Sequence, residues 1–224
     1  MNYKIALDGP SGAGKSSLAK RIAKELGIVY VDTGAMYRTI GLFVTRQGVS
    51  PDDEAAVCRL LPEIKLAICF EGGEQHILLD GEDVGGLIRT PEISMAASRV
   101  SAIPAVRAFL LDTQRDMAKK NSVIMDGRDI GTVIFPDAEV KIFLVASAEA
   151  RAQRRTAELA EKGIAATYEE VLADILKRDK NDREREVAPA VAAEDAVVLD
   201  NSLLDLDGTV AEALRIIRLR IGGV

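Results

Sequence analysis

The chain has 224 residues, which predicts one core domain with insertions rather than two full domains. Hydrophobic residues make up 48% and charged residues 29% of the chain, as in an ordinary soluble globular protein. The net charge of −6 argues against a general nucleic-acid binder, which neutralises phosphates with basic residues, although a local group of arginines can still bind a small phosphate ligand.

The first predicted elements are a strand at residues 4–7 and, after a glycine-rich turn, a helix at residues 16–26. Gly27 follows this helix at the position where glycine commonly ends one. A second short strand at residues 28–31 precedes a helix at residues 35–47. The chain therefore starts as an alternation of strands and helices.

The pattern changes at about residues 61–103, which we expect to be an insertion in the core. Residues 64–70 and 76–80 lie on either side of a Gly-Gly pair, and such a pattern is typical of a small antiparallel hairpin. Two helical segments follow, the second of which opens with Pro104. The insertion is therefore predicted to be a small antiparallel and helical subdomain.

The second half returns to alternating strands and helices. Its strands are short and continuously apolar, which indicates a parallel sheet covered on both faces by helices. The sequence therefore predicts an α/β fold with a doubly wound, mostly parallel sheet. The expected strands lie at residues 123–125, 140–145 and 196–199, and the helices begin near residues 147, 167 and 208.

The chain is predicted to form a single domain with three parts. They are a core of residues 1–60, 104–150 and 164–224, the insertion at about 61–103, and a short helical lid at about 151–163.

A phosphate-binding loop is predicted between the first strand and the first helix, where the sequence fits the Walker A spacing. Glycines let the loop direct its N–H groups at a phosphate, and the helix that follows presents its positive end to the same anion. Lys15 can reach the β and γ oxygens, and the Ser16 hydroxyl can bind Mg²⁺. A chance glycine-rich turn is disfavoured, because the glycine spacing, the Lys-Ser pair and the position between a strand and a helix all match a phosphate-binding loop. The predicted ATP contacts are Gly9, Pro10, Ser11, Gly12, Ala13, Gly14, Lys15, Ser16 and Ser17.

Several classes of protein share such a loop, so the loop does not identify the acceptor. A nucleotide-binding switch is one alternative, but the Asn-Lys-x-Asp signature that reads guanine is absent. The Asp-Gly-Arg-Asp run from Asp126 does not fit the Asp-x-x-Gly motif of such switches either. A kinase for UMP or for a hydroxyl acceptor remains the other alternative.

The arginines favour an acceptor that is itself a phosphate. A hydroxyl acceptor needs a base to remove its proton. A monophosphate loses its second proton at about pH 6 and instead needs its negative charge neutralised. Each arginine alone is best interpreted as a solvated surface charge, but several follow the carboxyl ends of strands, where open α/β sheets bind ligands. The arginines concerned are Arg38, Arg107, Arg128, Arg151, Arg154, Arg155, Arg178, Arg183 and Arg185.

Four motifs together resemble those of bacterial cytidylate kinases. They are Asp-Gly-Pro-Ser-Gly-Ala-Gly-Lys-Ser-Ser from Asp8, Asp-Thr-Gly-Ala-Met-Tyr-Arg from Asp32, Asp-Gly-Arg-Asp-Ile-Gly-Thr-Val-Ile-Phe-Pro from Asp126, and Arg-Asp-Lys-Asn-Asp-Arg-Glu-Arg from Arg178. The first is common among proteins with this loop, and the last two are far more specific. The likeness covers nearly the whole chain and implies Mg²⁺-dependent transfer of phosphate from ATP to CMP and dCMP, on a fold of the P-loop NTPase type.

The resemblance also implies roles for individual phosphate-binding residues. Lys15, Arg128 and Arg178 would be catalytic, with Arg128 near the acceptor phosphate and Arg178 near the transferring group. The remaining substrate contacts that it implies are Asp32, Thr33, Arg38, Asp182 and Arg185, of which Asp182 would touch the sugar with Arg178, and Thr33 stands where relatives carry Ser.

The same resemblance assigns Ser98, Arg107 and Asp129 to the cytosine base. A carboxylate accepts from the N4 amino group of cytosine, whereas uracil would place a carbonyl against it, so Asp129 should reject UMP. Each residue also has a structural interpretation. Asp129 can cap a turn, Ser98 and Arg107 can belong to a polar helix face, and Asp182 can form an ion pair with Arg185.

Residues 151–163 resemble the short mobile lid of this family. Arg151, Arg154 and Arg155 fall on one helical turn and would close on ATP, which excludes water as a competing acceptor. Asp126 ends a strand and is our candidate to hold Mg²⁺ through water, although Asp8 and Asp32 also end strands.

The remaining features predict a cytoplasmic enzyme that acts as a monomer. Cys58 and Cys69 have neither metal-ligand spacing nor a paired framework, and no apolar leader follows Met1. The longest apolar runs are of strand length, so we expect no membrane span. The acidic net charge leads us to expect no nucleic-acid partner. His76 is expected at an exposed strand position without a partner.

Overall fold

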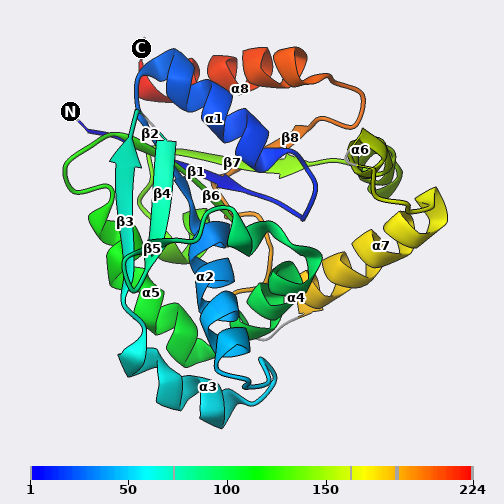
Figure 1. Ribbon diagram of the computed structural model, residues 1–224. Coiled ribbons are helices and arrows are strands. Elements are labelled where there is room, and N and C mark those ends of the chain that lie inside the picture. The colour runs from blue at the N-terminus through cyan, green and yellow to red at the C-terminus, as the bar shows by residue number, and fades with distance from the viewer. Residues whose placement is uncertain (1, 73, 162, 185–186, 223–224) are drawn as a thin grey trace. The chain divides into compact units, whose positions relative to one another are not determined.

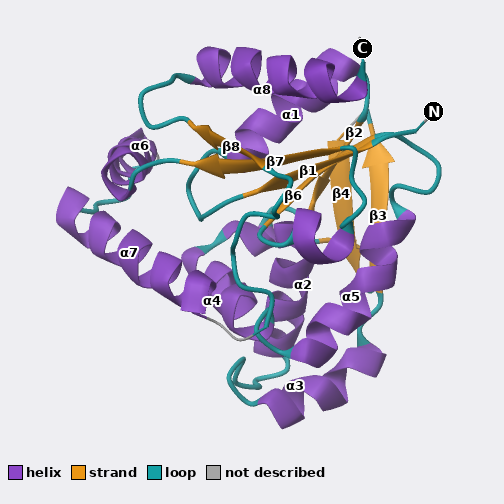
Figure 2. Cartoon of the chain, turned by 180° about the vertical axis from the view of Figure 1, so that it is seen from behind, coloured by secondary structure: helices purple, strands orange, loops and turns teal. Residues whose placement is uncertain are grey.

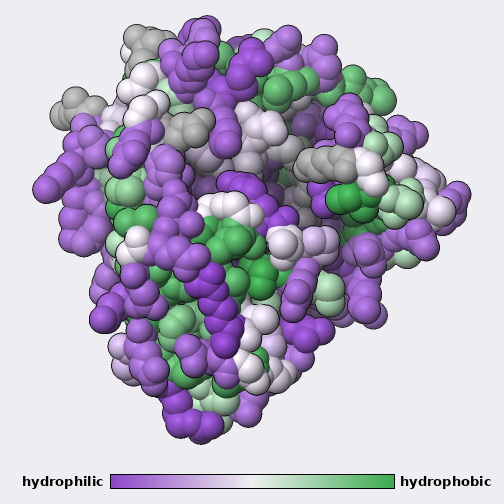
Figure 3. Space-filling model, viewed as in Figure 1, coloured by the Kyte–Doolittle hydropathy of each residue, from purple (hydrophilic) through white to green (hydrophobic). Residues whose placement is uncertain are grey.

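The computed structural model describes residues 2–72, 74–161, 163–184 and 187–222. The chain forms two compact units (Figure 1). The first contains residues 3–28 and the described residues from 124 onward, and the second contains residues 29–123. Hydrophilic side chains predominate on the face drawn in Figure 3, with hydrophobic ones in smaller groups between them.

Parallel strands form the centre of the first unit. They are β1 (Lys4–Asp8), β6 (Val123–Gly127), β7 (Val140–Val145) and β8 (Val197–Asp200), which lie in the order β6-β1-β7-β8. In the parallel pair of β1 and β7, Ile5 lies opposite Val140. Side chains of β1 and β6 are buried, as expected of a parallel sheet covered by helices.

The four α-helices that the structure describes in this unit lie in two pairs (Figures 1 and 2). Helix α1 (Lys15–Leu26) packs beside α8 (Leu206–Ile221), and α6 (Ala148–Glu161) packs beside α7 (Tyr168–Glu184). A short π-helical turn, η3 (Ile130–Ile134), follows β6 and lies against β1. Helix α1 ends where predicted, because Gly27 adopts the left-handed conformation and its N–H bonds the carbonyl of Ala23.

The second unit contains β2 (Val29–Asp32), which is the fifth strand of the mainly parallel sheet, and a separate antiparallel sheet. That sheet has the order β3-β4-β5, from β3 (Leu66–Glu71), β4 (Glu74–Leu79) and β5 (Glu82–Asp83). The predicted hairpin is therefore confirmed, and β5 adds a short third strand that the sequence pattern did not indicate. Together the two sheets confirm the predicted fold class.

The helices of the second unit enclose its hydrophobic core. Helix α2 (Thr33–Arg46) packs along α4 (Pro91–Val100), and Met36, Ile40 and Val100 are fully buried in this core. Gly41 permits the close approach of α2 and α4, because a Cβ at Gly41 would lie 3.0 Å from the backbone nitrogen of Ala97. The other elements are α3 (Glu54–Leu60), α5 (Pro104–Asp116) and the short 3₁₀ turns η1 (Leu61–Glu63) and η2 (Leu87–Arg89).

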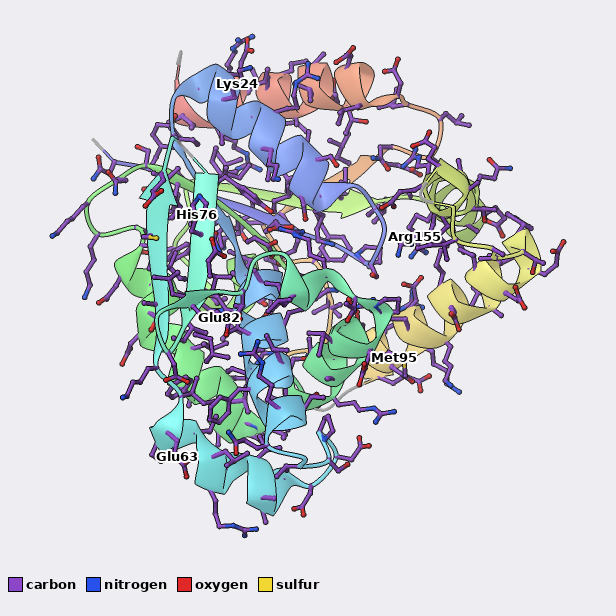
Figure 4. The ribbon with its side chains drawn as sticks, viewed as in Figure 1. Lys24, Glu63, His76, Glu82, Met95 and Arg155 are labelled. Atoms are coloured by element: carbon purple, nitrogen blue, oxygen red, sulfur yellow. The ribbon has the colours of Figure 1, made fainter. Side chains whose placement is uncertain are left out.

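Within the described part of the chain, no single helix is both long and apolar enough to cross a membrane, although α4 and α5, bent by 99°, pass that test as a pair. Cys58 and Cys69 are free and half-buried, in agreement with prediction. His76 differs from its prediction, because its Nδ1 lies 2.8 Å from Asp83 Oδ2 across the β4–β5 pair (Figure 4).

The close contact at Gly41 predicts a cost for any larger side chain. Gly41→Val should lower the free energy of unfolding by about 2 kcal/mol, because its methyl groups would force α2 and α4 apart. Gly86→Val is the matched control, since nothing lies within 4 Å of a Cβ there. Urea unfolding of both variants measures the difference, and equal stabilities would contradict the predicted packing.

Candidate active site

The phosphate loop runs between β1 and α1 in the first unit, and its backbone conformation requires glycine. Gly9 has a φ of 146°, and a Cβ there would lie 2.1 Å from the carbonyl oxygen of Leu144 in β7. Gly14, immediately before α1, has a φ of 89°. The two glycines thus let the loop pass close to the sheet and turn into the helix.

Lys15 is buried at the start of α1, and its ammonium donates to the carbonyl of Pro10, 2.7 Å away. Burial lowers the pKa of Lys15 to about 7, and the nearby Arg128 lowers it further, while Asp126, Asp8 and Asp182 act in the opposite direction. A phosphate bound beside Lys15 would favour its charged form. The lysine therefore occupies a site whose surroundings can accept added negative charge.

Ser16 and Asp126, the two residues that the sequence predicts to bind Mg²⁺, contact each other. The Ser16 hydroxyl donates to Asp126 Oδ2 at 2.8 Å, and Asp126 is buried at the end of β6. No cluster of three or more histidine, cysteine or acidic side chains suited to a metal ion occurs among the described residues. A hydroxyl and one carboxylate nevertheless fit Mg²⁺, which keeps several waters and takes phosphate oxygens as its other ligands.

Arg128 follows β6 and pairs with Asp182 of α7. Its Nε donates to Asp182 Oδ2 at 2.9 Å, and Asp182 is buried. The predicted alternative partner of Asp182, Arg185, lies outside the described residues. Arg178 lies one turn before Asp182 on the same helix and is half-buried. The structure therefore brings two of the predicted phosphate-binding segments together through one ion pair.

Asp129 is buried where η3 begins, but its side chain does not cap that turn. The N–H groups of Ile130 and Gly131 are instead bound by the carboxylate of Asp8, each at 2.8 Å. The turn-capping interpretation of Asp129 is therefore wrong. Asp8, which the sequence marked as the start of the first motif and as an alternative to Asp126 at a strand end, has that function.

Burial raises the pKa of Asp8 to about 6, even though the two backbone N–H bonds favour its ionised form. Asp129 nearby raises it further and Lys15 lowers it. The Asp8 carboxyl therefore titrates closer to neutrality than an exposed aspartate.

The three arginines predicted for the lid lie in different environments. Arg151 is only 4% exposed and pairs in a bidentate manner with Asp179 of α7, at 2.9 and 2.6 Å. It also donates to the carbonyls of Ser11 in the phosphate loop and Ala146 after β7. Arg151 is thus already engaged with the loop backbone in this structure.

The other two arginines are exposed on α6. Arg154 donates to the backbone carbonyls of Asn201 and Leu204. Arg155, labelled in Figure 4, pairs with Glu158 at 2.8 Å on the surface of the same helix. Of the three predicted arginines, these two are the exposed ones, whereas Arg151 is buried.

Asn201 is a loop-supporting residue that sequence reasoning missed. It is buried after β8, its side-chain amide donates to the carbonyl of Ala13 at 3.1 Å, and its backbone N–H bonds the carbonyl of Val145. A polar residue at the carboxyl end of a parallel strand was the available signal.

Asp32 lies at the centre of a group of charged residues in the second unit. Its buried carboxylate caps α2 at Ala35 and pairs with Arg38 at 2.9 Å, and the exposed Arg89 lies 3.8 Å away. The Nε of Arg38 is buried and has no hydrogen-bond partner among the described residues, which suits an anionic ligand. Thr33, the first residue of α2, is also buried.

Gln75 connects the antiparallel sheet to this group. Its side-chain oxygen accepts from the N–H of Asp32 at 2.8 Å, and its side-chain nitrogen donates to the carbonyl of Asp32 at 3.3 Å. No sequence pattern indicated Gln75, because its partner is 43 residues away.

Ser98 and Arg107, both predicted to contact the base, meet at Ser101 between α4 and α5. Arg107 donates to the carbonyl of Ser101 at 3.0 Å and lies over the ring of Tyr37, and the Ser101 hydroxyl donates to the carbonyl of Ser98. Both residues are half-buried. The structure therefore places these two predicted residues in one corner of the second unit.

Comparisons with known proteins identify relatives over nearly the whole chain. The sequence model of the cytidylate kinase family matches residues 5–219. The cytidylate kinase of Thermosipho melanesiensis is 48% identical over 218 residues, which cover 97% of this chain and 98% of that protein. That of Carboxydothermus hydrogenoformans is 48% identical over 96% of each chain. That of Pasteurella multocida is 46% identical over 96% of this chain and 94% of that protein.

A solved structure also shares the fold. An uncharacterized protein from Eubacterium ventriosum superposes with a TM-score of 0.55 and 13% identity, over 98% of this chain and 100% of that one. At this identity the likeness concerns the fold alone.

The Arg151–Asp179 pair predicts a large stability effect for a single carboxylate. Asp179→Ala should lower the free energy of unfolding by about 3 kcal/mol, because it leaves the buried Arg151 without its counter-ion. Glu158→Ala, which removes the exposed partner of Arg155, should cost less than about 0.5 kcal/mol. Denaturant unfolding of both variants tests this, and a small effect at Asp179 would refute the assignment.

The raised pKa of Asp8 predicts a pH dependence of stability. The folded state binds the proton more tightly than the unfolded state, so this contribution is complete below about pH 4 and is lost as the pH rises through about 6. The stability of wild type minus that of Asp8→Asn should therefore fall by up to about 3 kcal/mol between pH 4 and pH 7. Urea unfolding across that range measures it, and a difference that rises with pH would contradict the assignment.

Proposed function

This chain belongs to the cytidylate kinase family, and we propose that it transfers the γ-phosphoryl group of ATP to CMP and to dCMP with Mg²⁺. The observation that carries the proposal is the arrangement around Lys15: a buried lysine in a phosphate loop, a serine–carboxylate pair and an ion-paired arginine in one unit. Such a site suits the transfer of a phosphoryl group between two anions.

The phosphate loop would bind the triphosphate of ATP. Its N–H groups and the start of α1 contact the phosphates, and Lys15 neutralises charge on the β and γ oxygens. Arg151 positions the loop through Ser11, while Arg154 and Arg155 contact ATP when α6 closes.

Mg²⁺ would be held by Ser16 directly and by Asp126 through water. When bound, the ion neutralises charge on the phosphate oxygens. The chain's own part is to present the hydroxyl and the carboxylate 2.8 Å apart, at the edge of the sheet where the phosphate loop begins.

The acceptor's phosphate would be bound by arginines. Arg128 would serve this role in the first unit and Arg38 in the second, beside Asp32 and Thr33, while Arg178 would lie near the transferring group. Arg185 belongs to the same proposal, although it lies outside the described residues. Because each guanidinium presents several fixed donors, phosphate can replace a carboxylate as its partner without loss of geometry.

The acceptor's base would be read by Ser98 and Arg107 of the second unit and by Asp129 of the first. Ser and Arg side chains donate to the N3 and O2 acceptors of cytosine, and the Asp129 carboxylate accepts from its N4 amino group. Asp182 would contact the sugar. Uracil presents a carbonyl where cytosine has its amino group, so UMP should be a poor substrate.

The reaction needs no protein base, because the acceptor's phosphate is largely deprotonated at pH 7. One of its oxygens attacks the γ-phosphorus, the bond to the β–γ bridging oxygen breaks, and ADP leaves with the electron pair. The arginines and Lys15 act by holding the two anions together and by stabilising the charge of the transition state. A cytoplasmic location and a monomeric state belong to the same proposal.

A coupled assay of ADP release tests the proposal directly. CMP and dCMP should stimulate release at least about 10-fold more than UMP or AMP, which is the discrimination expected of one carboxylate–amine contact. Cytidine without its phosphate should be inert, which separates a hydroxyl kinase from a monophosphate kinase.

Lys15→Ala is the control for that assay, because it should lose about 1,000-fold in kcat while remaining folded. If no monophosphate stimulates release by the wild type, the proposed function is refuted. Near-normal turnover of Lys15→Ala would overturn the role of the lysine.

A further inference from the structure

We infer that Asp8 is a positioning residue, whose carboxylate fixes the segment bearing Arg128 and Asp129 to the end of β1 and so sets the discrimination between CMP and UMP. This inference rests on the proposed function, because it assumes that Asp129 reads the base. Asp8 itself touches neither base nor phosphate in the proposal.

Two short hydrogen bonds carry the inference. Asp8 Oδ1 accepts from the N–H of Ile130, and Asp8 Oδ2 accepts from the N–H of Gly131, each at 2.8 Å. Ile130 and Gly131 lie 122 and 123 positions after Asp8 in the chain. Asp8 is only 5% exposed, so water does not readily replace these partners. One carboxylate that binds two successive N–H groups fixes the orientation of the segment as well as its distance.

The position of these N–H groups explains why the carboxylate must come from another element. Ile130 and Gly131 begin η3, where the first N–H groups have no partner within the turn. Asp129 precedes the turn and would normally supply the cap, but its side chain makes no such bond. Since Asp8 satisfies the turn, the Asp129 side chain is not needed to cap it.

Packing around Gly131 keeps the contact tight. A Cβ at Gly131 would lie 3.1 Å from Cδ of Lys141 and 3.4 Å from Oδ2 of Asp8. A side chain at this position would have to displace the Lys141 side chain, while its Cβ would meet the Asp8 carboxylate at an ordinary van der Waals distance. The absence of a side chain at residue 131 therefore leaves room for Lys141 beside the bonded backbone.

Asp8 can act as a fixed reference because its own backbone and that of the next residue are held against β7. It lies opposite Phe143 in the parallel pair of β1 and β7 and directly precedes Gly9, which lies against Leu144. Arg128 and Asp129 precede the bonded N–H groups by only one to three residues. Because catalysis and specificity depend on sub-ångström placement, loosening this anchor should affect both residues.

The test compares Asp8→Asn with Asp129→Ala by measuring kcat and KM for CMP, UMP and ATP. Asp8→Asn keeps the size of the side chain but has only one acceptor oxygen. Its NH₂ group, which is a donor, would face the second backbone N–H and could not bond it. We expect the ratio of kcat/KM for CMP to that for UMP to fall about 10-fold, while KM for ATP changes less than about 3-fold. Asp137→Asn, at an exposed carboxylate that pairs with Lys4, is the matched control and should leave the ratio unchanged.

A double variant separates positioning from a general loss of stability. If Asp8 acts through Asp129, then Asp8→Asn combined with Asp129→Ala should have the same CMP-to-UMP ratio as Asp129→Ala alone. Additive losses would overturn the inference. An unchanged ratio in Asp8→Asn, with a lowered ratio in Asp129→Ala, would overturn it as well and leave the proposed function intact.

Hydrogen exchange gives a readout that does not depend on activity. The amides of Ile130 and Gly131 should exchange at least about 10-fold faster in Asp8→Asn than in wild type, with those of β7 unchanged. Unchanged exchange would refute the anchor even if the chain did not phosphorylate CMP. Should Asp8→Asn fail to fold, Asp8→Glu, which keeps both oxygens but displaces them, is measured by the same criteria.

Discussion

A site that binds a nucleoside triphosphate and a nucleoside monophosphate must keep its cations in place before either ligand arrives, and a buried cation without a counter-ion costs several kcal/mol. Aspartates meet this requirement throughout the chain. In the first unit Asp182 pairs with Arg128 and Asp179 with Arg151, and in the second Asp32 pairs with Arg38. Each pair holds a guanidinium in a defined orientation, which reduces the conformational entropy that phosphate binding must still remove.

The need to hold the site in place before the ligands arrive also explains why several side chains bond the backbone carbonyls of the phosphate loop. Lys15 bonds the carbonyl of Pro10, Asn201 that of Ala13 and Arg151 that of Ser11. These carbonyls are held by side chains of the loop's own helix, the segment after β8 and α6. Their engagement leaves the N–H groups of the loop to the ligand, which is the preorganisation that favours charge stabilisation in the transition state.

The aspartates near the segment that follows β6 have different bonding roles. Asp126 bonds Ser16, Asp8 satisfies the start of η3, and Asp129 makes no capping bond there. Burial raises the pKa of Asp8, and the nearby Asp129 carboxylate adds to this effect by charge repulsion. Lys15 of α1 and the two backbone N–H groups of η3 lower the pKa of Asp8, so its ionised form depends on one cation and two backbone donors from two elements.

The sequence alone determined what is local. The spacing from Gly9 to Ser17 and the strand before it predicted the loop, the Gly27 stop predicted the end of α1, and continuously apolar strands predicted a parallel sheet. The motifs at Asp126 and Arg178 indicated the family, because the order and spacing of their residues can be read directly from the sequence. Only the tertiary structure decided the partners of Asp8, Asn201 and Gln75 and the burial of Arg151. Those contacts join residues 43 to 188 positions apart, and no periodicity or short motif records which distant backbone group a polar side chain will meet when the chain folds.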